Sequence, residues 1–178
     1  MAGQRLTDKT ALEQQTSSGD LYMIVDVSDT TGSAAGTSKK LDSKFVIQTD
    51  KISLSNAEVK ALDTAEKPLV SALTGYMITP ISATVLCTYA AVTENQRKDL
   101  IIGFDDSIDT SYWSKVHDCM DGKTTNMTYI IGGFDQTKEG SWTASTINKP
   151  LVCWAEGTGF VGGWSCDIYI TYCYTKIL

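Results

Sequence analysis

The sequence predicts a mainly β protein, with a C-terminal antiparallel β-sandwich of jelly-roll type preceded by a short helix and an extended N-terminal region. Two segments carry this prediction, residues 81–89 and 166–174. In both, apolar and polar residues alternate with the period of two that a half-buried strand requires. Shorter apolar runs recur at intervals set by Gly, Asp and Asn, and helix signals are few, which favours a sandwich.

The residue pattern between Leu21 and Leu41 predicts a strand, a loop and a second strand. An apolar run from Leu21 to Val27 is followed by small and polar residues and then by the pair Lys39-Lys40. Ser, Thr, Gly, Ala and Asp cannot fill a core, so the stretch between the two strands reads as a loop. A capping box at residues 10–13 predicts a turn of helix before them.

A short helix is predicted to begin at Ser55-Asn56-Ala57-Glu58. In such a capping box the Ser hydroxyl and the Glu carboxylate each bond a backbone amide that the helix leaves unpaired. Pro68 disfavours helix at the residue before it, so the helix has about ten residues at most.

The strands of the sandwich follow. In residues 81–89 the alternation places Ile81, Ala83, Val85, Cys87 and Tyr89 on one face. In residues 166–174 it points Ile168 and Ile170 inward and Asp167 and Thr171 outward. Shorter strands are expected at residues 100–104, 127–131 and 151–154. Between Asp109 and Met120 apolar residues recur at helical spacing, so a short helix is an alternative there.

The distribution of aromatic residues predicts the domain organisation. Of the 16 aromatic residues, only Tyr22 and Phe45 precede residue 69. A segment nearly without aromatic side chains buries little area by itself and depends on a partner surface. We therefore expect an attachment region at residues 1–52, a short helix and linker at 53–68, and a β-sandwich knob domain at 69–178.

Charge and cysteine content exclude several function classes. With 15 basic and 21 acidic residues the net charge is −6, which disfavours nucleic acid or an anionic membrane as a partner. The five cysteines are odd in number and form no C-x-x-C pair, so we expect reduced, mostly buried thiols. No secretory signal is evident, and we expect synthesis in a cytoplasm.

The segment Gly19 to Leu41 resembles one that recurs near the start of fibre and appendage proteins of tailed bacteriophages. A second set, formed by residues 55–62, Pro68-Leu69-Val70, Gly75 and the strand at 81–89, is similar to the start of a β-sandwich module found in many phage structural proteins. The two resemblances imply a non-enzymatic virion protein, assembled in the bacterial host cytoplasm.

The fibre resemblance also implies a homotrimer attached by its N-terminal region to other virion proteins. Because nothing like a long shaft lies between the anchor and the sandwich, we expect a short head fibre or decoration protein, with capsid protein as its partner and a host-surface glycan as a further ligand. A tail fibre, tail adaptor or receptor-binding protein is the alternative of the same kind. A carbohydrate-active enzyme with paired carboxylates is the alternative from another class.

The expected anchor contacts lie on the two N-terminal strands: Leu21, Tyr22, Ile24, Val25, Lys39 and Lys40. The expected glycan contacts are Trp142 and Trp164, which lie close to Gly and Ser and could offer an aromatic face to a sugar ring.

Motifs for catalysis are missing from the sequence. His117 is the only histidine, its sequence neighbours point to other faces, and no G-x-S-x-G, H-E-x-x-H or P-loop motif occurs. The glycine-rich stretch 157–163 lacks the Lys of a phosphate loop and reads as a turn. The acidic cluster Asp105, Asp106 and Asp109 suits either Ca²⁺ or the capping of turns. We therefore expect no catalytic residue, metal ligand or cofactor.

Overall fold

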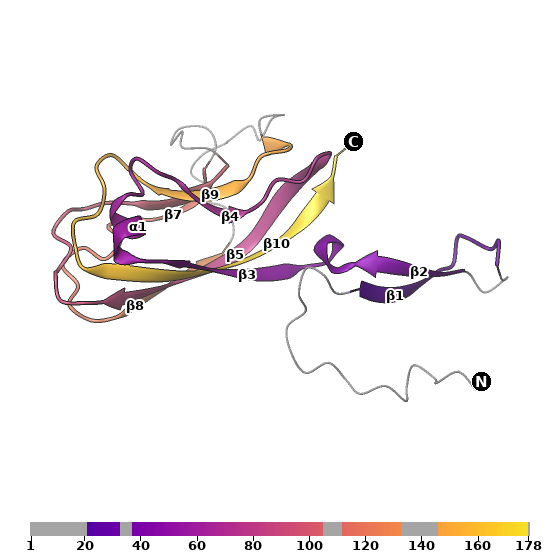
Figure 1. Cartoon of the computed structure of the whole chain (residues 1–178), viewed down its shortest axis with the longest axis horizontal. Helices are drawn as coiled ribbons and strands as arrows, with labels where there is room; N and C mark the ends of the chain where they lie inside the picture. The colour runs from indigo at the N-terminus through magenta and orange to yellow at the C-terminus, as the bar shows by residue number, and fades with distance from the viewer. Residues whose placement is uncertain (1–20, 33–36, 105–111, 133–145, 178) are drawn as a thin grey trace. The chain divides into compact units, whose positions relative to one another are not determined.

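The computed structural model describes residues 21–32, 37–104, 112–132 and 146–177, and its strands form two four-stranded antiparallel sheets and a two-stranded hairpin (Figure 1). The hairpin pairs β1 (Leu21–Asp26) with β2 (Thr37–Asp42). One sheet has the order β3 (Gln48–Leu54), β10 (Trp164–Lys176), β5 (Tyr76–Tyr89) and β8 (Met127–Gly132). The other has the order β4 (Lys67–Val70), β9 (Leu151–Ala155), β6 (Leu100–Gly103) and β7 (Tyr112–Val116). The predicted β-sandwich is confirmed.

The strand pairs are nested in the way that defines a jelly roll. Strand β3 pairs with β10, β4 with β9, β5 with β8 and β6 with β7, so the chain folds back on itself around β6 and β7. The chain changes sheet at every connection between successive strands from β3 to β10 except that between β6 and β7. Two layers of strands result, as Figure 1 shows.

The chain divides into two compact units, Met1–Lys44 and Phe45–Leu178. The described part of the first unit is the hairpin. A short 3-10 helix, η2 (Ser43–Phe45), spans the boundary. This boundary differs from the expected ones at residues 52 and 69, because β3 pairs along its whole length with β10 and β4 pairs with β9. In this division β3 and the residues of the predicted linker belong to the sandwich unit.

The core lies between the two sheets and follows the alternation of β10. Trp164, Cys166, Ile168, Ile170 and Tyr172 are all buried, and the residues between them are half-buried. Ile168 and Ile170 have no exposed surface, so the inward orientation predicted for both is confirmed. Opposite them, Leu100, Ile102, Leu151 and Cys153 of the second sheet complete the same cluster.

Ile81 departs from the predicted face of β5. Ala83, Val85 and Cys87 are buried as expected, but Ile81 is 40% exposed. The pairing explains the difference, because Ser82 lies opposite Thr171 whereas Pro80 lies opposite Tyr172. Ile81 is thus the extra residue of a β-bulge, which reverses the alternation at this point.

The alternative of a helix between Asp109 and Met120 is wrong for the described residues, because Tyr112–Val116 form strand β7. Gly103 lies opposite Tyr112 and Ile102 opposite Ser114, so Trp113 is an extra residue in the ladder. Because of this irregularity, Trp113 and Val116 are both buried although they are three residues apart. A separation of three residues is also the spacing of a helix face, which explains the helical pattern in the sequence.

Helix α1 (Asn56–Lys60) begins with the predicted capping box. The Ser55 backbone N–H donates to Glu58 Oε2 at 2.8 Å, and the Glu58 N–H donates to Ser55 Oγ at 3.4 Å. The helix has 5 residues, fewer than the ten allowed by Pro68. Val59 and Leu62 are buried in the main core and fix the connection between the sheets.

Removing buried side chain from β10 is expected to cost far more stability than removing exposed side chain from β8. Ile168 is fully buried, so Ile168→Ala should lower the free energy of unfolding by about 2–5 kcal/mol, as for other core Ile to Ala changes. Ile130 is 81% exposed, and Ile130→Ala should change it by less than about 0.5 kcal/mol. Urea unfolding followed by tryptophan fluorescence measures both. Equal losses would contradict the assigned core.

Candidate functional site

The hairpin β1–β2 holds the residues expected to contact a partner. Its register places Tyr22 opposite Leu41 and Ile24 opposite Lys39. Residues that face each other across a ladder share one side of it, so Tyr22, Ile24, Lys39 and Leu41 lie on one face. Tyr22 is 37% and Ile24 39% exposed, so this face presents apolar surface to solvent. The side chains of Leu21 and Val25 lie outside the described part of the structure.

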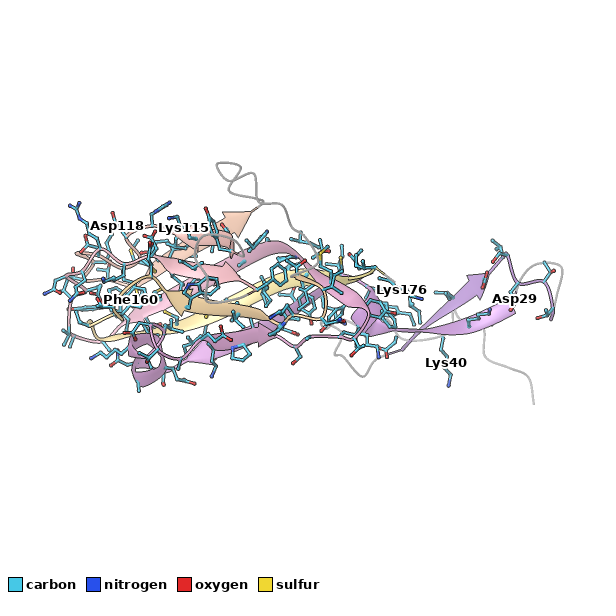
Figure 2. The ribbon with its side chains drawn as sticks, turned by 90° about the horizontal axis from the view of Figure 1, so that it is seen from above. Asp29, Lys40, Lys115, Asp118, Phe160 and Lys176 are labelled. Carbon is cyan, nitrogen blue, oxygen red and sulfur yellow. The ribbon has the colours of Figure 1, made fainter. Side chains whose placement is uncertain are left out.

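Lys39 and Lys40 have different surroundings, although the sequence suggests a joint role. Lys39 Nζ lies 3.1 Å from Asp26 Oδ2 and 2.8 Å from Asp29 Oδ2. The ion pairs in the described part of the hairpin involve Lys39 and Lys44, not Lys40. Figure 2 shows the Lys40 side chain pointing away from the ribbon. Lys39 therefore forms ion pairs within the hairpin, whereas the side chain of Lys40 is exposed to solvent.

Short side-chain bonds shape the turn that follows β1. Asp26 Oδ1 accepts the Ser28 backbone N–H at 3.1 Å and the Ser28 hydroxyl at 2.6 Å. Asp29 Oδ1 accepts the equivalent pair from Thr31. The Ser28 hydroxyl, followed by Lys39, lowers the pKa of Asp26 to about 2. The Asp26 and Asp29 carboxylates thus order the start of the loop and hold Lys39 across the two strands.

The hairpin has little to stabilise it on its own. Each strand has 6 residues, and none of the side chains described in β1 and β2 is buried. An isolated two-stranded hairpin is marginally stable at best in water, because it lacks a second layer to cover its apolar residues. Its exposed face is therefore suited to docking on another protein.

Trp164 is not available as a glycan contact, contrary to expectation. Its side chain has no exposed surface, and its ring packs against that of Tyr89 with centroids 5.1 Å apart. Gly162 and Gly163 allow this close packing, since a Cβ on Gly162 would lie 2.7 Å from Trp164 Cδ1. The flanking glycines thus indicate tight packing rather than exposure. Trp142 and the cluster Asp105, Asp106 and Asp109 lie outside the described residues.

The Glu94 carboxylate fixes the conformation of the glycine-rich stretch 157–163, a role that no sequence motif indicates. It is fully buried and its Oε2 accepts the N–H groups of Val161 and Gly162, both at 2.8 Å. Its Oε1 accepts the N–H of Gln96 at 3.0 Å. A single Glu in a polar segment carries no sequence signal for such a role. The glycine-rich stretch is held over Trp164 by this carboxylate.

His117 belongs to a surface cluster around Asp99. Its Nδ1 lies 3.0 Å from Asp99 Oδ2, and Lys115 Nζ lies 3.0 Å from the same oxygen. Asp99 Oδ1 also accepts the Asp118 N–H at 3.1 Å. Burial by itself would raise the pKa of Asp99, but the bonds from Lys115 and Asp118 outweigh it and leave this pKa lowered. The cluster fixes the turn after β7.

An open cleft of about 220 Å³ lies beside the end of α1 and strand β9. It is lined by Leu62, Asp63, Thr64, Glu66, Trp154, Ala155 and Gly157. Trp154 exposes only 3% of its surface, so the cleft has polar edges but no open aromatic face on which a sugar ring could stack. No motif in the sequence indicates these residues.

Comparison with protein-family models and with curated proteins finds no match for this chain. Within the described ranges, no group of three or more His, Cys, Asp or Glu side chains is placed to hold a metal ion. No helix in the described part is long and apolar enough to cross a membrane.

The ion pairs of the hairpin predict how Asp26 titrates. Because its folded pKa is lowered from 3.8 to about 2, its stabilising contacts are complete above about pH 4 and are lost as the pH falls through about 2. In Lys39→Met the pKa of Asp26 should rise toward 3.8 but stay below it, since the bonds from Ser28 remain.

Side-chain carboxyl NMR over a pH series measures this change. Asp42 provides the control, because Lys44 lowers its pKa and Lys39 does not. An Asp26 titration that is identical in the wild type and in Lys39→Met would contradict the bridging role of Lys39.

Proposed function

We propose that this chain is a structural, non-enzymatic virion protein that attaches by its hairpin to another virion protein and displays its jelly-roll domain. The observation that carries the proposal is the division into two units, of which one has a full core and the other is a hairpin without a buried side chain among those described. A hairpin that forms a unit of its own is expected to serve attachment rather than to support the sandwich. The resemblance of residues 19–41 to phage appendage proteins supports a virion as the setting.

The fold agrees with this proposal at the level of analogy. Jelly rolls with two four-stranded sheets occur in viral capsid and lectin domains, although a fold by itself does not specify a function. The strand order found here is of that type. The resemblance further implies three copies per fibre, in which case three hairpins would bind their partner with the avidity of a linked assembly.

We propose capsid protein as the partner, as in a short head fibre or decoration protein. The sandwich follows the hairpin directly, since Phe45 already belongs to the second unit and β3 begins at Gln48. A tail fibre that must reach a host receptor needs a longer shaft between anchor and tip. The proposed contact surface is the exposed face with Tyr22 and Ile24, and Lys40 adds a positive charge on the opposite face of the hairpin.

Cross-linking of intact virions tests the location. An amine-reactive cross-linker followed by mass spectrometry should join Lys40 to major capsid protein, because the Lys40 ammonium is exposed in the hairpin. Lys51, in strand β3 of the sandwich, serves as the internal comparison and should give fewer links to capsid protein. Links from Lys40 to tail proteins alone would overturn the head location. Absence of the chain from purified virions would overturn the proposed function itself.

A negative charge in place of Ile24 on the exposed hairpin face should weaken attachment. Burial of an Ile side chain at an interface is worth roughly 1.5–3 kcal/mol, so Ile24→Asp should reduce incorporation into virions at least about tenfold. The matched control is Ile130→Asp on β8, where the same change on a more exposed Ile should leave incorporation unaltered. Quantitative blotting of purified virions measures both variants. Equal loss of the two variants, or unchanged incorporation of Ile24→Asp, would contradict docking through the hairpin.

A further inference from the structure

Three buried cysteines from three different segments meet inside the sandwich. Cys87 belongs to β5, Cys166 to β10, and Cys119 to the turn after β7. Their exposed fractions are 1%, 5% and 0%. The Sγ atoms of Cys87 and Cys166 are 3.3 Å apart. Cys119 lies close enough to Cys87 to lower the pKa of its thiol. All three are free thiols in this structure.

We propose that Cys87 and Cys166 form an oxidisable dithiol, which hydrogen peroxide converts into a disulfide between the two central strands of the sheet. The proposal concerns a covalent modification site and does not depend on the virion location proposed above. Its basis is the placement of the two thiols.

The backbone already has the spacing that a disulfide needs. Cys166 lies directly opposite Cys87 in the antiparallel ladder of β10 and β5. Opposed residues in such a ladder have Cα atoms about 4.5–5.5 Å apart, which falls within the range of about 4.4–6.8 Å found for disulfides. The two sulfur atoms must approach from 3.3 Å to about 2.05 Å. Small side-chain rotations shared between the two residues can supply that approach.

Cys119 lowers the pKa of one of the two opposed thiols, that of Cys87. The Cys119 backbone N–H donates to the Lys98 carbonyl at 2.7 Å, and the neighbouring Met120 N–H donates to the Tyr129 hydroxyl at 2.8 Å, so the turn is fixed in place. Hydrogen bonds from Cys119 and then Cys166 lower the pKa of Cys87, whereas bonding to Cys87 and burial raise the pKa of Cys166. Cys87 is therefore the thiol that ionises first and attacks the oxidant.

The reaction balances with one peroxide molecule. The Cys87 sulfur attacks one peroxide oxygen, the O–O bond breaks, and with one proton from solvent the products are Cys87 sulfenic acid and water. The Cys166 sulfur then attacks the sulfenic sulfur, the S–S bond forms, the S–O bond breaks, and the oxygen leaves as a second water. The two thiols lose two electrons and two protons, and the peroxide is reduced to two waters.

Cys153 shows what an ordinary buried thiol looks like in the same core. It belongs to β9 of the other sheet and is fully buried. Burial raises the pKa of its thiol to about 12, and no thiol bond accompanies that shift. Cys153 should therefore resist peroxide, which makes it the matched control.

The test uses the purified full chain carrying Cys173→Ala, which removes the one half-exposed thiol and with it disulfide-linked dimers through that residue. After treatment with hydrogen peroxide, the intact mass should fall by about 2 Da, the loss of two hydrogens that a disulfide requires. Peptide mapping should place the bond between Cys87 and Cys166. Cys87→Ala and Cys166→Ala should abolish the mass change, whereas Cys153→Ala should retain it.

A second measurement needs no core variant. The disulfide would close a loop between residues 79 apart in sequence and constrain the unfolded chain, so the thermal midpoint of the oxidised protein should rise by on the order of 10 °C and return on reduction. No loss of two hydrogens, a bond mapped to Cys119, or an unchanged or lower thermal midpoint after oxidation would overturn the proposal. These outcomes leave the proposed attachment through the hairpin untouched.

Discussion

The long antiparallel pairing of β5 with β10 is the constraint on which the sandwich depends. All thirteen residues of β10 have a partner in β5, from Trp164 opposite Tyr89 to Lys176 opposite Tyr76. Strands β3 and β8 add to the two sides of this pair, and its inward residues form one wall of the core. Because side chains alternate along a strand with a period of two, a slip of one residue in this ladder would turn the inward residues of either strand to the other face. The same register brings Cys87 and Cys166 together.

The sequence predicts the fold where local pattern and final environment agree. The alternation in residues 166–174 and the Ser55–Glu58 capping box both reflect short-range physics, and both occur as expected. The failures arise where pairing with a distant strand adds a residue, as at Ile81 opposite the step between Thr171 and Tyr172. Strand β3 escaped notice for a similar reason, because its polar outward residues are stabilised by β10, with Thr49 bonded to Thr171 and Lys51 paired with Asp167. Such partners cannot be identified from one segment alone.

The same distinction applies to the candidate site. The apolar run beginning at Leu21 is visible in sequence, and it does form a strand of an exposed hairpin. The different roles of Lys39 and Lys40 become clear only from the register of β1 and β2, which brings Lys39 within ion-pair distance of Asp26 and Asp29. Trp164 was expected to be exposed because glycines flank it, but glycine permits close packing as well. Glu94 has no recognisable sequence pattern because two of its three donors, Val161 and Gly162, lie more than sixty residues away. The surroundings of Lys39, Lys40, Trp164 and Glu94 depend on how the chain folds and cannot be inferred from the residue types alone.

The ion pairs of the hairpin matter for binding because the hairpin has little stability of its own. A segment that becomes ordered only on binding must offset its ordering entropy from the binding free energy, which lowers affinity. Contacts that already favour the hairpin in the free protein reduce that cost, which is the principle of preorganisation. Lys39, held by Asp26 and Asp29 across the two strands, is placed to do this, while Tyr22 and Ile24 remain exposed on the same face. On the proposed function, the charged residues of this face set how readily the hairpin is presented, and the apolar residues determine how tightly it binds.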